Sequence, residues 1–289
     1  MQHDPASTNA PVHIAWTLSL LTASAMLAFA ANSLLARLAL LTTPIDAATF
    51  TTLRLAAGAL TLVCILRAQG GRLALDKTAW LSAAMLFTYA AAFSFAYRSI
   101  STGAGALVLF SAAQLTMIAW GLRKGERASV WGMLLAGAGM LVFLAPSAST
   151  PPLGAAMLMA LAGFAWGGFS LLGRTRGAPI ASTAASFVCA LPFALVLLLF
   201  QRGQLHIDWT GTMYAVLSGS VTSSMGYAIW YRVRTRLTAI SAGAVQLSVP
   251  VISAALGIVL LGEALTFRGA IAALAVLGGI AWVTLSARR

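Results

Sequence analysis

The stretch Leu261-Gly262-Glu263-Ala264-Leu265-Thr266-Phe267-Arg268-Gly269 decides the fold of this chain, because an earlier stretch repeats its pattern. Residues 124–132 lie 137 positions earlier and share the spacing Gly-Glu-x5-Gly. In both copies the Gly-Glu pair follows one long apolar run and precedes another. A repeat at this spacing in a chain of 289 residues indicates two halves rather than a short solenoid unit. The matched residues are Gly125, Glu126, Gly132 and Ser111 in the first copy, and Gly262, Glu263, Gly269 and Ser248 in the second.

The composition of the chain excludes a water-soluble domain. Apolar residues make up 60% of the chain and charged residues only 8%, and the mean hydropathy is +0.90. A soluble domain carries roughly 25% charged residues, so this chain cannot cover a water-exposed surface. Only helices and closed barrels span lipid, and continuous apolar runs of about 20 residues indicate helices. The sequence therefore predicts an all-α integral membrane protein.

Ten apolar segments follow one another, joined by short connections that carry Gly, Pro or charge. Each segment is long enough to cross a hydrocarbon core of roughly 30 Å as a helix. Five fall in each half, so we expect a first repeat over 1–149 and a second over 150–289. Because five is odd, the second half must be inverted in the membrane, and inverted repeats characterise secondary transporters. The predicted spans are 14–36, 46–66, 78–98, 101–121, 130–146, 152–172, 179–200, 209–230, 239–261 and 266–286.

Positive charge assigns the orientation of these spans. With the N-terminus inside, inner loops and the C-terminus hold thirteen of the 18 Lys and Arg residues, outer loops hold four, and Arg54 lies within a span. We therefore expect a bacterial-type inner (plasma) membrane with both termini cytoplasmic. Residues 1–13 lack the Lys or Arg that a signal peptide needs, so the first segment is interpreted as a retained helix. The inner set is Arg67, Arg72, Lys77, Arg123, Lys124, Arg127, Arg174, Arg176, Arg232, Arg234, Arg236, Arg288 and Arg289, and the outer set is Arg37, Arg98, Arg202 and Arg268.

The net charge of +12 does not indicate a nucleic-acid partner, because the basic residues are spread over short loops. The cysteines, Cys64 and Cys189, both lie in apolar runs and are interpreted as small buried hydrophobes rather than a disulfide or metal site. No cofactor or metal is expected. Ten spans can enclose a cavity alone, so we expect a monomer in the lipid bilayer.

The positions of the acidic residues bear on mechanism. All six fall in termini, loops or span ends, and the histidines are peripheral as well. Proton-driven carriers commonly use an intramembrane carboxylate or histidine, so facilitated export is the simpler interpretation, with sodium held by backbone carbonyls left open. The spans also lack a His/Glu/Asp cluster at ligand spacing, so an enzyme is not expected. The acids are Asp4, Asp46, Asp76, Glu126, Asp208 and Glu263.

Arg54 is the charge that lies inside a span, about eight residues into the second segment. Burial of an Arg at a helix centre costs on the order of 2.5–3.5 kcal/mol on the insertion scale. One interpretation is a contact to an anionic or carboxylate group of a substrate. The other is an interhelical tie to backbone carbonyls or to Asp46.

Polar and aromatic side chains gather near mid-span on several segments. Tyr89, Phe93 and Tyr97 recur at i, i+4 and i+8 and therefore share one helix face. A Gln in hydrocarbon needs a partner, so Gln114 and Gln246 face another helix or a wet cavity. Core packing is the simpler role for any one aromatic residue, and the set on equivalent helices is the stronger indication. The candidate substrate-binding residues are Tyr89, Phe93, Phe110, Gln114, Trp166, Ser170, Tyr227, Gln246, Ser248 and Arg54.

Pro250 lies in the middle of the ninth predicted span and is the candidate hinge. A proline frees a backbone carbonyl, which bends a helix or helps to line a cavity. The counterpart of Pro250 at the offset of 137 is Ala113, so the two halves differ here. This difference between the halves fits a transport pathway whose two ends are not equivalent.

The two copies as a whole resemble a known family. Residues 97–132 and 231–269 each hold an aromatic residue at a helix end, then a small-residue stretch, then Gly-Glu and Gly. This pattern resembles the EamA-type repeat of the drug/metabolite transporter superfamily. The second copy is close to the family pattern through Gln246-Leu-Ser-Val-Pro250, whereas the first has Ala113 where Pro is usual. Arg54 falls where the family tends to carry an Arg in its second helix.

The resemblance implies a ten-helix carrier, and the family includes exporters of amino acids and other metabolites. Trp166 looks like the tryptophan of the sixth helix in the family's aromatic amino-acid and paraquat exporters, whose cavity residues lie on helices three, four, six, eight and nine. The leading hypothesis is export of amino acids or similar small zwitterions by alternating access, with broad specificity. The alternatives are efflux of organic cations, for which no embedded carboxylate is present, and a non-transporting membrane subunit.

Overall fold

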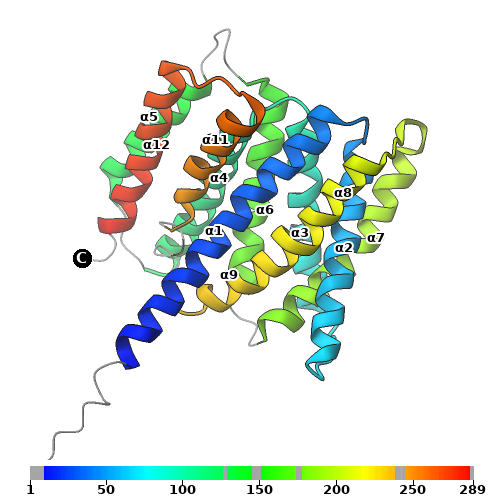
Figure 1. Ribbon diagram of the computed structural model, residues 1–289. Coiled ribbons are helices and arrows are strands. Elements are labelled where there is room, and N and C mark those ends of the chain that lie inside the picture. The colour runs from blue at the N-terminus through cyan, green and yellow to red at the C-terminus, as the bar shows by residue number, and fades with distance from the viewer. Residues whose placement is uncertain are drawn as a thin grey trace, which may run out of the picture.

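The computed structural model describes residues 10–125, 129–144, 151–173, 178–237, 242 and 245–286, with side chains from Trp16 onward except that of Thr284. Every regular element in these residues is helical (Figure 1). The predicted all-α class is therefore confirmed. Glu126 of the first Gly-Glu copy lies outside the described residues, as do Asp4, Arg127, Arg174, Arg176, Arg288 and Arg289.

The helices follow one another with short connections. The first half holds α1 (Ala10–Thr42), α2 (Ala47–Ala68), α3 (Lys77–Tyr97), α4 (Thr102–Arg123) and α5 (Val130–Leu144). The second holds α6 (Leu153–Gly173), α7 (Pro179–Phe200), the 3-10 turn η2 (Arg202–Gln204), α8 (Trp209–Leu217), η3 (Ser218–Met225), α9 (Gly226–Arg234), α11 (Ser248–Leu261) and α12 (Phe267–Ser286). The elements α8, η3 and α9 follow without a gap, so residues 209–234 form one continuous rod whose middle is a π-helix.

Six described helices are long and apolar enough to cross a membrane, namely α1, α2, α3, α4, α6 and α7. Three shorter apolar helices cover Val130–Leu144, Ser248–Leu261 and Phe267–Val283. The rod 209–234 occupies the eighth predicted span. The helices thus coincide with the predicted segments, whereas the count of ten crossings stays a prediction.

Carboxylates set the starts of three helices. Asp46 accepts the N–H groups of Ala48 and Thr49, both at 2.9 Å, and in the same way Asp76 caps α3 and Asp208 caps α8. A side-chain oxygen at this position satisfies a backbone donor that the helix itself leaves open, and its loss costs about 0.5–2 kcal/mol. These acids therefore have structural roles at the helix ends.

The glycines of the repeated Gly-Glu pair end two equivalent helices. Gly125 follows α4 with φ +84°, and Gly262 follows α11 with φ +63°. A residue with a Cβ is strained in this left-handed conformation, so glycine is the residue that fits both turns. The recurrence of Gly at an offset of 137 thus has the same backbone cause in both copies.

The ninth predicted span differs from the prediction at its start. α11 begins at Ser248, directly after a turn at Leu247, although helical residues also occur at 242 and 245–246. Pro250 therefore lies in the first turn of α11, where its missing N–H would be unpaired in any case. Because Pro250 cannot donate to the carbonyl of Gln246, the helix does not run on continuously through 246–250. The structure places Pro250 at the start of a helix rather than at a kink in one.

The packing of helices has an internal symmetry. α1 packs against the rod 209–234 and α11, just as α6 packs against α3 and α4. α2 packs against the same rod, just as α7 packs against α3. Three further pairs, α2 with α7, α4 with α11, and α5 with α12, each map onto themselves when the first five helices are exchanged for the last five. Figure 1 shows α5 and α12 side by side at one edge of the bundle, with α2 and α7 at the opposite edge.

Candidate functional site

The centre of the bundle is a cluster of aromatic side chains from α1, α3, α6 and α9. The ring centroid of Trp166 lies 4.8 Å from that of Tyr227 and 5.2 Å from that of Tyr89, and Phe29 meets Trp166 edge-on at 5.2 Å. Such pairs contribute about 0.5–1.5 kcal/mol each beyond their buried area. They surround a space of about 10 Å³, room for one water molecule at most. This central pocket is lined by Phe29, Asn32, Ser33, Tyr89, Phe93, Leu109, Phe110, Trp166 and Tyr227.

Arg54 of α2 lies directly behind the wall that Tyr89, Phe93 and Tyr227 give to the central pocket. It is only 1% exposed. Its Nη2 donates to the hydroxyl oxygens of Tyr89 at 2.9 Å and Tyr227 at 3.0 Å, and its Nε donates to the Oγ of Ser223 at 3.1 Å. The guanidinium also lies 5.1 Å from the ring centroid of Tyr89 and 4.9 Å from that of Phe93, within cation–π range. Residues from three other helical elements thus hold this charge.

The charge of Arg54 meets no carboxylate among the described residues, and its buried Nη1 has no hydrogen-bond partner there. The tie to Asp46 considered from the sequence is wrong, because Asp46 caps α2 and accepts the N–H of His206 at 2.8 Å. Burial alone would raise the pKa of Asp46, but hydrogen bonds from Thr49, His206 and Ala48 outweigh burial and lower that pKa. The nearest acid in sequence is therefore already engaged.

Asn32 of α1 is a site residue that the sequence reasoning missed. Its Nδ2 donates to the hydroxyl of Tyr89 at 3.0 Å. Its Oδ1 accepts from the hydroxyls of Ser218 at 2.7 Å, Thr222 at 3.2 Å and Ser223 at 3.4 Å. The signal that could have revealed it is an amide in the middle of an apolar span, where an unpaired polar group is costly. Phe29, one turn earlier on α1, was missed as well, because an aromatic residue in an apolar run carries no distinguishing signal.

The π-helix η3 explains how one amide meets three hydroxyl groups. Hydrogen bonds in a π-helix run from i to i+5, so residues four and five apart share one face of its wide turn. Ser218, Thr222 and Ser223 occupy this face and point at Asn32. Gly219 lets the turn lie against α2, since a Cβ there would overlap the carbonyl oxygen of Arg54. π-Helical turns occur frequently at functional sites.

Gln246 joins the site through Trp166. The indole Nε1 donates to the Oε1 of Gln246 at 3.1 Å, and both side chains are buried. The Nε2 of Gln246 is buried without a partner in the described part of the chain. A buried amide with an unused donor costs about 1–3 kcal/mol relative to a satisfied one. The site therefore holds a second unused donor besides the Nη1 of Arg54.

The other predicted site residues fall into two groups. Phe110 lines the central pocket and stacks near Phe29, with 6.5 Å between ring centroids. Gln114 and Ser170 are buried on α4 and α6 but do not line the pocket, and the Oγ of Ser170 has no partner among the described residues. Ser248 is exposed and donates to the carbonyl of Val245 at 2.8 Å, so the structure does not bring it to the cluster.

One end of the central pocket is closed by a network of polar side chains from Arg37, Glu263 and Thr102, which we call the polar knot. Arg37 of α1 donates to the carbonyl of Tyr97 at 2.7 Å and pairs with Glu263 at 3.4 Å. Glu263 in turn accepts the N–H of Thr102 at 2.8 Å and 2.9 Å and its hydroxyl at 3.1 Å. Tyr97 lies one helical turn beyond the pocket residue Phe93. We call this end of the bundle the Glu263 end.

Aromatic packing closes the opposite end. The hydroxyl of Tyr231 donates to the carbonyl of Phe169 at 3.1 Å, and the two rings lie 5.5 Å apart. Trp230 is fully buried beside Phe29, with 5.8 Å between ring centroids. Arg234, interpreted from the sequence as a topogenic charge, is also buried here and donates to the carbonyl of Leu237 at 2.9 Å. The central pocket is therefore occluded at both ends in this structure.

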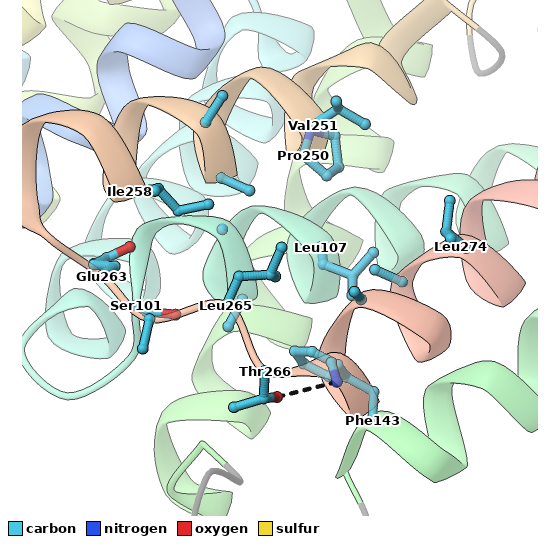
Figure 2. Close-up of a pocket in the computed structure, with 18 of the residues that line it drawn as sticks. Ser101, Leu107, Phe143, Pro250, Val251, Ile258, Glu263, Leu265, Thr266 and Leu274 are labelled. Carbon is cyan, nitrogen blue, oxygen red and sulfur yellow. Dashed lines mark hydrogen bonds between the residues drawn. The ribbon is translucent and has the colours of Figure 1, made fainter.

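A second hollow, the lateral groove, lies outside the core between α4, α11 and α12 and has a volume of about 660 Å³. Figure 2 shows Ser101, Glu263 and Thr266 toward one end of it and Leu274 at the other. Its walls are mainly apolar, and Pro250 and Val251 of α11 contribute to them. This groove is far larger than the central pocket, but the charged residues at its walls, Glu263 and Arg268, already have hydrogen-bond partners. The unpaired buried donors lie beside the smaller space.

The central cluster has the chemistry of a binding site. Arg54, Asn32 and the tyrosine hydroxyls supply hydrogen-bond donors, and Phe29, Trp166 and Tyr227 supply aromatic faces. A carboxylate accepts charge-assisted hydrogen bonds from a guanidinium, and an apolar side chain packs against aromatic rings. The described residues contain no group of three or more His, Cys, Asp or Glu that could hold a metal ion.

A bundle of apolar helices with an occluded polar and aromatic centre defines a multi-pass membrane protein, and membrane transporters share this architecture. The model of the EamA-like transporter family matches residues 153–285, so the second half of the chain belongs to this family, within the drug/metabolite transporter superfamily. The match covers the second half, in which the Gly-Glu repeat is closer to the family pattern.

Two comparisons extend over nearly the whole chain. A protein of Pseudomonas aeruginosa described as uncharacterised is 52% identical over 267 residues, which are 91% of this chain and 93% of that protein. A solved crystal structure is similar with a TM-score of 0.68, over 94% of this chain and 98% of that chain. At 22% sequence identity the structural likeness shows the fold alone.

Proposed function

We propose that this protein is an inner-membrane exporter of amino acids or related small metabolites that works by alternating access. The observation that carries the proposal is the buried Arg54, whose Nη1 lacks an acceptor behind an occluded aromatic pocket. A free guanidinium donor there suits the carboxylate that all amino acids share. The aromatic walls suit side chains of varied shape, which gives broad specificity.

The proposal includes two inverted halves, 1–149 and 150–289, and ten crossings. The exchange symmetry of the helix pairs supports this division, and so does the shared left-handed turn at Gly125 and Gly262. The excess of Lys and Arg in the loops assigned inside supports cytoplasmic termini. In this orientation the Glu263 end faces outward. The protein works as a monomer in this proposal, because one chain encloses the central pocket.

The test is counterflow of radiolabelled amino acids in liposomes that contain the purified protein, without an ion gradient. We expect saturable exchange with the wild type, and at least a tenfold loss with Trp166→Ala or Gln246→Ala, because Trp166 lines the pocket and Gln246 accepts the hydrogen bond that holds its indole. Trp131→Ala is the matched control, since Trp131 is 71% exposed on α5. Unchanged flux in both pocket variants would contradict the site.

Other outcomes would favour the alternatives. Saturable flux of organic cations without flux of amino acids would favour drug efflux, for which aromatic faces provide cation–π contacts. The positive charge of Arg54 opposes this alternative. Folded protein that carries neither class would favour a non-transporting subunit.

A further inference from the structure

We propose that the preferred cargo carries a net negative charge, as a carboxylate without a free ammonium group, and that the membrane potential drives its export. This inference rests on the proposed transport function and narrows its substrate class. It follows from an imbalance between hydrogen-bond donors and acceptors around Arg54, and from the absence of a carboxylate in contact with Arg54 among the described residues.

The donors are in excess. A guanidinium has five N–H donors, and the hydrogen bonds of Arg54 use Nε and Nη2, which leaves both hydrogens of Nη1. The Nδ2 of Asn32 and the hydroxyl of Tyr227 are also directed at the hydroxyl of Tyr89. An anionic oxygen would take up this excess through charge-assisted hydrogen bonds of about 1.5–3 kcal/mol.

The two amide oxygens near the pocket, those of Asn32 and Gln246, are already occupied. The Oδ1 of Asn32 accepts from three hydroxyl groups, and the Oε1 of Gln246 accepts from Trp166. The rings of Tyr89 and Phe93 already face the guanidinium. An ammonium group brings three donors and a second positive charge, and neither amide oxygen is free to accept from it. Its positive charge would also be repelled by the buried guanidinium of Arg54.

The charge of the cargo decides how the cycle responds to voltage. Arg54 stays fixed in α2, so the net charge that crosses the membrane in one cycle is that of the cargo. An inside-negative potential then pushes an anion outward, with about 2.3 kcal/mol for each charge and 100 mV, on the order of a 50-fold gradient. A zwitterion gains nothing from this potential. The four described acids all lie at helix ends, so proton coupling through an embedded carboxylate has no support among them.

The experiment compares three compounds with one side chain: leucine, N-acetyl-leucine, which lacks the ammonium, and leucinamide, which lacks the carboxylate. Liposomes with the full chain receive a tenfold potassium gradient and valinomycin, which sets about 59 mV. We expect N-acetyl-leucine to be preferred and its steady-state distribution to follow the potential, with a tenfold ratio across the membrane. Leucine should exchange less well, with a ratio near one, and leucinamide should not be carried.

The outcomes separate this inference from the proposed function. Leucine carried better than N-acetyl-leucine and without voltage dependence would overturn the inference and leave the amino-acid exporter standing. Leucinamide carried alone would overturn both, and so would folded protein that carries none of the three. Arg54→Gln should abolish the preference for N-acetyl-leucine over leucine, whereas Arg98→Gln, at an exposed arginine, should keep it. Because the wild type alone decides the main result, a variant that fails to fold does not affect the test.

Discussion

The molecule contains two hollows of opposite character. The lateral groove has a volume of about 660 Å³ and mainly apolar walls, and its side chains Val251, Leu265 and Leu274 are exposed on the outside of the bundle. The central pocket has about 10 Å³, and Asn32 and Tyr89 in its wall contact each other beside the buried charge of Arg54. The lateral groove thus offers volume and mainly apolar surface, whereas the central pocket offers buried polar groups.

In our proposal, unmet hydrogen-bonding capacity, and not volume, distinguishes the binding site from the groove. A buried donor without an acceptor is costly, so its presence calls for a partner that binds there. The residues that line the lateral groove include no buried side-chain donor without an acceptor in the described part of the chain. The small size of the central pocket fits the proposed alternating access, which requires a state closed at both ends.

The largest expected effect comes from replacing an arginine by methionine, once beside the central pocket and once at the lateral groove. Arg54→Met should reduce saturable flux at least 100-fold, because it removes the charge that would bind a carboxylate. Arg268→Met at the rim of the lateral groove should change flux less than twofold. Thermal unfolding in detergent should show that Arg54→Met remains folded, since the hydroxyls of Tyr89 and Tyr227, which lose the guanidinium, still bind each other and Asn32. Equal losses in the two variants would remove the distinction between the regions.

Much of the fold could be predicted from the sequence, because lipid permits few solutions. Apolar runs of about 20 residues must form helices there, and the described helices lie at the predicted segments. The start of α11 was harder to predict. A proline in an apolar run suits a kink as well as a first turn, and the difference depends on the turn at Leu247, which periodicity does not reveal.

The candidate site was predicted in part. Arg54 stood out because a charge in a span is rare, and the tyrosines followed from their spacing on one face. Asn32 was missed although the argument used for Gln114 and Gln246 applies to it equally. Ser248 was included because it recurs at the repeat spacing, yet it lies at an exposed helix start. The partners of a side chain depend on how helices rotate against each other, and the sequence pattern leaves that rotation open.

Asn32→Asp would sharpen the comparison by placing a carboxylate inside the central network. The new anion would lie one hydroxyl group from Arg54, since both residues bind the hydroxyl of Tyr89. We expect at least a tenfold loss of N-acetyl-leucine flux, because the internal anion competes for the guanidinium. The midpoint of thermal unfolding should not fall. Asn32→Ala serves as the control, and it should lower that midpoint because it leaves hydroxyl groups without an acceptor.

Glu263 lies between the two regions, because it lines the lateral groove and also belongs to the polar knot that closes the central pocket. A substitution there tests how much this closure contributes to stability. Glu263→Gln removes the ion pair with Arg37 and weakens the hydrogen bonds to Thr102. Hydrogen bonds to a charged group contribute about 1.5–3 kcal/mol, so we expect unfolding at a temperature several degrees lower. Leu265→Ala, at the same rim, should change the midpoint by about a degree at most, because the side chain of Leu265 is 61% exposed. An unchanged midpoint in Glu263→Gln would show that the polar knot does not stabilise this occluded state.

The smallest effect is expected from filling the lateral groove. Val251→Trp adds a large apolar side chain to a wall residue that Figure 2 shows on α11. If lipid occupies the groove, the variant should retain less co-purified phospholipid, while counterflow should stay within twofold of the wild type. Leu260→Trp is the control, because Leu260 is exposed on the same helix and does not line the groove. A loss of flux as large as that of Trp166→Ala would place the groove on the transport path, because a space that serves only lipid has no part in moving the cargo.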